Sequence, residues 1–98
     1  MSQRQLQIVN VALTTANNEY SITIPTGAIN VQMKLGDATN TVKIYQVSVG
    51  NAGSPANFWT IDAGQVSPFA PTVQDQQTFY LMSAASGVSL QVSYYLDQ

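Results

Sequence analysis

Apolar and polar residues alternate along most of the chain, with the period of two that is typical of β-strands. The clearest case is residues 29–35, where Ile29, Val31, Met33 and Leu35 alternate with polar side chains. Such a strand buries one face and exposes the other, or presents it to a partner. The same pattern predicts further strands at about residues 5–13, 19–24, 42–49, 58–61, 78–83 and 88–96.

Residues 42–49 differ from the other predicted strands because both of their faces carry apolar side chains. Val42 and Ile44 share one face, whereas Tyr45 and Val47 share the other. A strand that is apolar on both faces lies in the middle of a sheet or has its outer face covered. We therefore expect this strand to be central or covered.

The segments between the predicted strands are rich in residues that form turns, notably at 36–41 and 50–57. Residues 65–77 carry two prolines and little alternation, which indicates a long crossing connection. About seven or eight short strands at regular spacing favour an all-β fold. We predict a single antiparallel β-sandwich, or jelly-roll-like domain, over residues 1–98 with a short N-terminal arm at about 1–5.

Charged residues make up 8% of the 98 residues, against about 25% in an average soluble domain. Gln, Asn, Ser and Thr take the place of the missing charges. A surface depleted in charge suits a face that is covered by another subunit, because the cores of protein interfaces are depleted in charge. The alternative is a soluble monomer coated with amide and hydroxyl groups. The composition favours contact with other subunits.

The residues needed for most enzyme chemistry are missing. The chain contains no histidine and no cysteine, which excludes a Ser-His-Asp triad and makes a transition-metal site unexpected. Asp37, Asp62 and Asp75 fall in predicted loops or strand ends, where a glycosidase-like pair of carboxylates could form. The interpretation that we favour is that such carboxylates stabilise turns. We expect no enzyme activity, no cofactor and no metal.

Nucleic acids and membranes are not expected partners. The net charge is −2, and Arg4, Lys34 and Lys43 are scattered singly, whereas phosphate binding requires clustered basic residues. The sequence has no apolar run long enough for a transmembrane helix. Its first residues also lack the apolar region of a signal peptide, so we expect synthesis in the cytoplasm.

Two pairs of adjacent aromatic residues, Phe58-Trp59 and Tyr94-Tyr95, lie in predicted strands. Neighbouring side chains in a strand point to opposite faces, so one member of each pair should enter the core and the other should face outward. An outward Trp59 or Tyr95 would anchor a subunit interface, lie under a loop of its own domain, or stack on a sugar.

Three segments resemble small structural proteins of tailed bacteriophages. They are WTIDAGQ (59–65), FYLMSAASGVSLQVSYYL (79–96) and TTANNEYSITIPTGA (14–28). The resemblance implies a jelly-roll-like virion protein, made in the host cytoplasm and binding capsid or other virion proteins. The type that it favours is a homotrimeric decoration (cement) subunit that stabilises the shell.

The contact residues expected for such a subunit are Arg4, Gln5 and Gln7 in the N-terminal arm and Trp59 and Phe69 near the long loop. Two alternatives remain open. One is a fibre, neck or tail accessory subunit of the virion. The other is a β-sandwich module that binds a carbohydrate or a receptor through the loops at 50–57 and 65–77.

Overall fold

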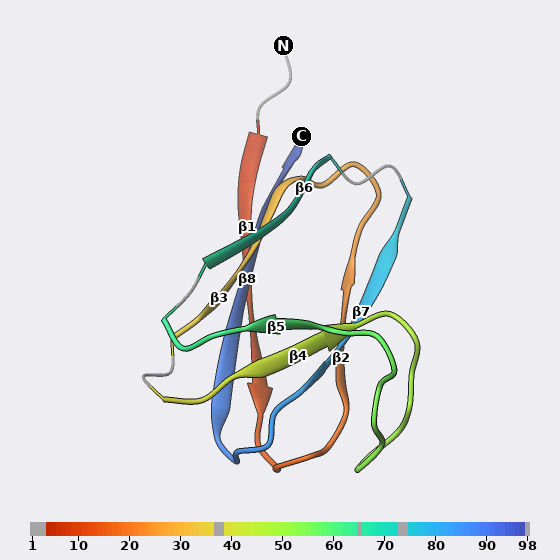
Figure 1. Ribbon diagram of the computed structural model, residues 1–98. Coiled ribbons are helices and arrows are strands. Elements are labelled where there is room, and N and C mark those ends of the chain that lie inside the picture. Colours follow the sequence, from red (N-terminus) through yellow and green to blue (C-terminus); the bar gives the residue numbers. More distant parts are fainter. Residues whose placement is uncertain (1–3, 37–38, 65, 73–74, 98) are drawn as a thin grey trace.

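The computed structural model describes residues 4–36, 39–64, 66–72 and 75–97, with the backbone alone for Arg4, residues 66–72 and Asp97 (Figure 1). Residues 1–3 of the predicted N-terminal arm lie outside this range. The described chain is built from strands, with no helix, and none of it could therefore cross a membrane as a helix. The strands are β1 (Arg4–Leu13), β2 (Tyr20–Ile24), β3 (Ile29–Leu35), β4 (Val42–Tyr45), β5 (Trp59–Ile61), β6 (Val66–Thr72), β7 (Gln77–Met82) and β8 (Val88–Asp97).

The eight strands form two four-stranded sheets. Sheet A has the order β1-β8-β3-β6 and sheet B has the order β2-β7-β4-β5. Every pairing between neighbours is antiparallel. Eight strands divided between two sheets in this order form a jelly roll, so the predicted fold class is confirmed. In Figure 1 the start of β1 and the end of β8 lie at the same end of the molecule because these two strands are antiparallel neighbours.

The core lies between the two sheets and uses the predicted alternation. In β3, Val31, Met33 and Leu35 are buried while the residues between them are exposed. The other sheet contributes Ile24, Ile44, Ile61 and Leu81 to the same cluster, and β8 contributes Val88, Leu90, Val92 and Tyr94. Burying one large aliphatic side chain contributes about 1.5–3 kcal/mol, so these residues hold the sheets together.

The predicted strand at 42–49 is shorter than expected, because β4 ends at Tyr45. Its position is as predicted, since β4 lies between β7 and β5 in sheet B. The chain leaves the sheet because the backbone amides of Val49 and Gly50 donate to the Glu19 side chain and not to a neighbouring strand. Val47, expected on a covered face, is consequently 77% exposed.

The expectation of a long connection at 65–77 is wrong. Residues Val66–Thr72 form β6, which pairs with β3 in sheet A. Pro68 and Pro71 are compatible with this strand because β6 is at the edge of the sheet, where a residue without an N–H donor costs no ladder hydrogen bond on the solvent side.

Candidate functional site

An apolar groove lies where β4 ends and the 46–58 segment leads into β5, and we call it the β5 groove. Its volume is about 770 Å³, within the usual range of about 300–1,000 Å³ for ligand pockets. Gln46, Ser54 and Asn57 contribute polar groups to its lining. The remaining lining residues are apolar or aromatic: Ile44, Tyr45, Val47, Val49, Pro55, Ala56, Phe58, Trp59 and Phe79.

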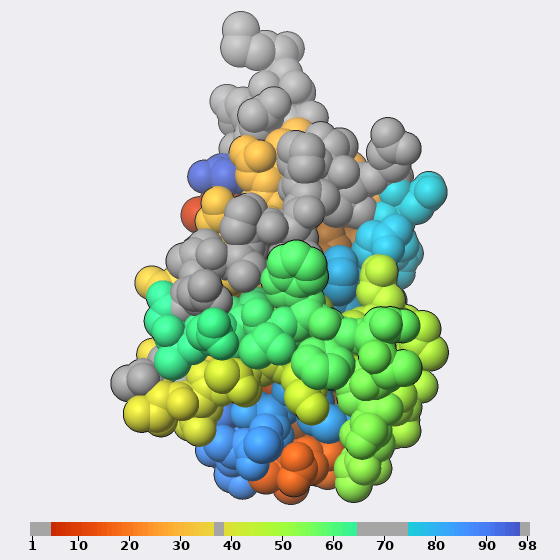
Figure 2. Space-filling model, in the orientation of Figure 1, coloured from red at the N-terminus to blue at the C-terminus, as the bar shows by residue number. Residues whose placement is uncertain are grey.

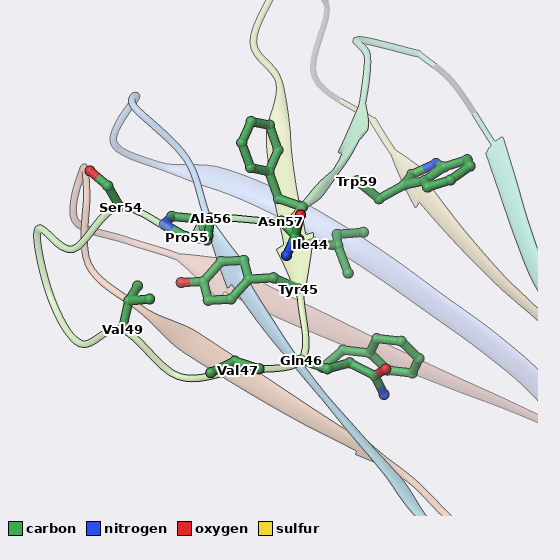
Figure 3. Close-up of a pocket in the computed structure, with 12 residues that line it drawn as sticks. Ile44, Tyr45, Gln46, Val47, Val49, Ser54, Pro55, Ala56, Asn57 and Trp59 are labelled. Atoms are coloured by element: carbon green, nitrogen blue, oxygen red, sulfur yellow. The ribbon is translucent and has the colours of Figure 1, made fainter.

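The groove is an open feature of the surface. Figure 2 shows the segment from β4 to β5, in yellow to green, spread across the lower front of the molecule. In Figure 3, Tyr45 lies near the centre, with Ser54 and Val49 towards one end and Trp59 at the other. The groove is therefore bounded by the end of a rigid sheet on one side and by a loop on the other.

Trp59 is the first residue of β5 and lies opposite Ile44 of β4, so the two side chains share the face directed toward the core. Ile44 and Ile61, which share this face, are buried, but Trp59, at the first position of the edge strand β5, remains 64% exposed. The structure therefore places Trp59 at the surface and excludes it from the buried core. The prediction of an exposed Trp59 as a contact residue is compatible with this position.

Phe58 lies just before β5 and is 47% exposed. The Lys43 ammonium lies 4.7 Å from the centre of its ring, at a distance where cation–π attraction is effective. The prediction that one of these adjacent aromatics enters the core is wrong for Phe58 and Trp59, because Phe58 is outside the strand and β5 is at an open edge. For the other pair it is correct, with Tyr94 8% and Tyr95 38% exposed.

The loop that forms one wall of the groove is held by Glu19, from the β1–β2 connection. One carboxylate oxygen accepts hydrogen bonds from the Tyr45 hydroxyl at 2.9 Å, the Val49 amide at 2.8 Å and the Gly50 amide at 3.2 Å. The other accepts a hydrogen bond from the Ser48 hydroxyl. The Glu19 carboxylate thus accepts hydrogen bonds from residues 48–50, as the carbonyl groups of a neighbouring strand would do within a sheet.

Protonation states in this cluster follow from its hydrogen bonds. Burial raises the pKa of Glu19, but the hydrogen bonds from Ser48, Val49, Tyr45 and Gly50 outweigh this effect and hold the pKa below its usual value of 4.5. Burial raises the pKa of the Tyr45 hydroxyl, and the hydrogen bond to Glu19 raises it further. At neutral pH the anionic carboxylate therefore faces a protonated phenol.

The same loop depends on glycine. Gly50 has φ of +79°, which is readily accessible to a residue without a side chain. At Gly53 a Cβ atom would lie 2.4 Å from the carbonyl oxygen of Val49, well inside van der Waals contact. Glycine at positions 50 and 53 thus permits a close turn in the loop expected at 50–57, beside the groove.

Two of the remaining predicted contact residues, Gln5 and Gln7, do not line the groove. Gln5 and Gln7 lie in β1 opposite Leu96 and Tyr94 of β8, and Gln5 is exposed whereas Gln7 is partly buried. Arg4 also belongs to β1 and lies opposite Asp97. The side chains of Arg4 and Phe69 lie outside the described residues, so their predicted roles in contact stay predictions.

The carboxylates do not form a recognisable chemical site in the described ranges. No group of three or more potential metal-ligating side chains occurs among the residues that the structure describes. Asp75 is exposed, Asp62 lies just after β5, and Asp37 is outside the described residues.

A comparison with protein-family models, curated proteins and solved structures finds no match to the chain. Function is therefore inferred from the groove and the surface themselves. The sequence indicated Trp59 and the loop at 50–57, but it did not indicate Glu19 or the groove. The one available signal for Glu19 was an acidic residue beside a strand in a chain with only five carboxylates.

Proposed function

We propose that this chain is a non-enzymatic subunit that binds another protein of a larger assembly through the β5 groove. The observation that carries this proposal is the grouping of Val47, Phe58 and Trp59, three exposed large apolar residues, around one groove. Aromatic side chains, tryptophan above all, are the usual anchors of protein interfaces. Covering them would remove apolar surface from water, at about 25 cal/mol for each Å² buried.

The assembly that we propose is the virion of a tailed bacteriophage, with this chain as a homo-oligomeric capsid decoration subunit that stabilises the shell. Three points support the proposal. Residues 59–65 and 79–96 resemble small phage structural proteins, 8% of the chain is charged, and jelly rolls are frequent in viral capsid proteins. Because one fold can host many functions, the proposal is tested by changing a residue of the groove and measuring binding. A role in the fibre, neck or tail would use the same surface on another virion partner.

The test is saturable co-sedimentation of the purified protein with capsids of the phage that encodes it, before and after Trp59→Ala. Trp59 is exposed, so the free energy of unfolding of the variant should stay within about 0.5 kcal/mol of the wild-type value, as for most surface substitutions. Loss of an interface anchor should weaken capsid binding by at least about tenfold, the equivalent of about 1.4 kcal/mol.

The matched control is Tyr95→Ala, which removes an exposed aromatic from sheet A, away from the groove. It should leave capsid binding unchanged. Equal binding by wild type and Trp59→Ala would show that the groove is not the contact. Failure of the wild-type protein to bind capsids, tails or fibres of that phage would exclude the virion role.

A second candidate function is carbohydrate binding, favoured by the polar side chains of Gln46, Ser54 and Asn57 beside the aromatic residues of the groove. Aromatic faces stack on the C–H surfaces of sugar rings, and side-chain amides both donate to and accept from hydroxyl groups. A glycan array probed with wild type and Trp59→Ala separates the two functions. Glycan binding that requires Trp59, without capsid binding, would establish the second.

A further inference from the structure

β1 is an edge strand that lacks the usual protection against pairing with another chain. It forms one side of sheet A, and in the described part of the chain it pairs with β8 alone. Its ten residues pair in one continuous register, contain neither proline nor glycine, and carry one charge, at Arg4. Natural edge strands usually carry charges, prolines or bulges that block further pairing.

The other edges of the two sheets differ from β1. β6, at the opposite edge of sheet A, carries Pro68 and Pro71 and a register shift in its pairing with β3. The edges of sheet B are short, with five residues in β2 and three in β5. β1 is therefore the longest regular edge among the described strands, and its exposed side chains include Leu6, Ile8 and Val9.

We propose that β1 pairs with β1 of a second copy of this chain in antiparallel orientation. The two four-stranded sheets A would then form one continuous sheet across a two-fold axis. The interface is self-complementary, as a two-fold contact requires. It uses a surface separate from the β5 groove, so it does not depend on the proposed function.

The sequence of β1 favours one register, with the two-fold axis at Gln7. In that register Leu6 lies opposite Ile8 of the second copy, and the relation is repeated on the other side of the axis. Both side chains are about half exposed in the single chain, and cross-strand apolar pairs of this kind stabilise a sheet. Arg4 lies opposite Asn10, so no like charges meet across the pairing.

The area of this contact is that of a weak, transient interface. In this register residues 4–10 of β1 pair with the same residues of the second copy, and seven residues at about 3.4 Å each make an edge about 24 Å long and, with side chains on both faces, about 10–15 Å high. Pairing would bury roughly 250–350 Å² on each copy, or about 500–700 Å² in total, which is below the area of a standard stable interface. A reversible dimer is therefore expected rather than a permanent one.

The experiment is sedimentation equilibrium of the full chain from about 10 μM to about 1 mM, with Ile8→Lys as the test variant. Ile8 is 53% exposed, so its replacement should leave the fold intact, which circular dichroism checks. Pairing would bury the lysine charge against Leu6 of the second copy. Dimerisation should therefore weaken by at least about tenfold. Gln76→Lys, at an exposed position outside both β1 and the β5 groove, is the control for the added charge and should dimerise like wild type.

A second measurement tests the register. The chain has no cysteine, so Gln7→Cys introduces a single thiol at the two-fold axis. Opposed Cα atoms in antiparallel strands lie about 4.5–5.5 Å apart, within the range of about 4.4–6.8 Å that a disulfide requires. Gln7→Cys should therefore form a covalent dimer on mild oxidation. Ser93→Cys, one strand inward on β8, should not.

The result that supports the proposal is a dimer that Ile8→Lys weakens and Gln7→Cys traps. A monomer at about 1 mM, a trimer as the phage resemblance implies, or a dimer that Ile8→Lys leaves intact would each overturn it. These readouts use the protein without capsids or glycans. Failure of the pairing is therefore distinguishable from failure of the groove to bind its partner.

Discussion

Glu19→Ala removes the acceptor of four hydrogen bonds that hold the wall of the β5 groove. The donors differ in how easily water can replace the carboxylate. The Ser48 hydroxyl and the Gly50 amide are at exposed positions and can turn to solvent. The Tyr45 hydroxyl and the Val49 amide are partly buried and lose their partner.

Two partly buried donors set the size of the effect. A buried donor left without an acceptor costs about 1–3 kcal/mol, and partial access to water puts these two at the lower end. The expected loss in the free energy of unfolding is therefore about 2 kcal/mol. For a domain of about 100 residues, this lowers the melting temperature by roughly 8–16 °C.

Thermal and urea unfolding, followed by circular dichroism, measure this loss. Glu19→Gln keeps one acceptor oxygen and should lose about half as much. Asp75→Asn is the matched control, because it also removes one negative charge but from an exposed carboxylate of the β6–β7 connection. If Glu19→Ala costs no more than Asp75→Asn, the carboxylate does not hold the loop and the account of the groove wall is wrong.

Two further predictions concern the same loop. Because the folded state lowers the pKa of Glu19, its contribution to stability is complete above the usual pKa of 4.5 and is lost as the pH falls through the folded value. The stability difference between wild type and Glu19→Gln should therefore shrink in acid, as paired urea titrations at neutral pH and about pH 3 would show. Gly53→Ala places a Cβ atom 2.4 Å from the Val49 carbonyl oxygen. It should destabilise the protein by about 1–3 kcal/mol in the same assay, and unchanged stability would show that the loop can shift at no cost.

The positions of most strands, and the faces that they bury, were predictable because both depend on neighbouring residues. In β3 and β8 the period of two placed Met33, Leu35, Leu90 and Val92 on one face, and all four are buried. The pairing order of the strands depends on contacts between distant segments. The fold class was therefore predictable from the sequence, whereas the order of the strands in each sheet is known only from the structure.

The wrong predictions also concern features that depend on contacts between distant segments. Val47 continues the alternation of β4, but the amides of Val49 and Gly50 are taken by a carboxylate about thirty residues away. β6 was not predicted because Pro68 and Pro71 usually interrupt strands, and only the sheet order shows that β6 is at an edge. Phe58 and Trp59 are both exposed for a similar reason, since local alternation does not reveal where a sheet ends.

The two proposed contacts lie at opposite sides of the sandwich. β1 is in contact with β2, and β2 and β5 are the two opposite edges of sheet B. Pairing through β1 would therefore leave the groove of each copy free, and the dimer would present two grooves. On a surface with repeated sites, the second groove would bind at an effective concentration of about millimolar. A shallow groove of modest affinity would then suffice for stable attachment, because the weak pairing through β1 and the weak contact at Trp59 would reinforce each other only on a repetitive partner.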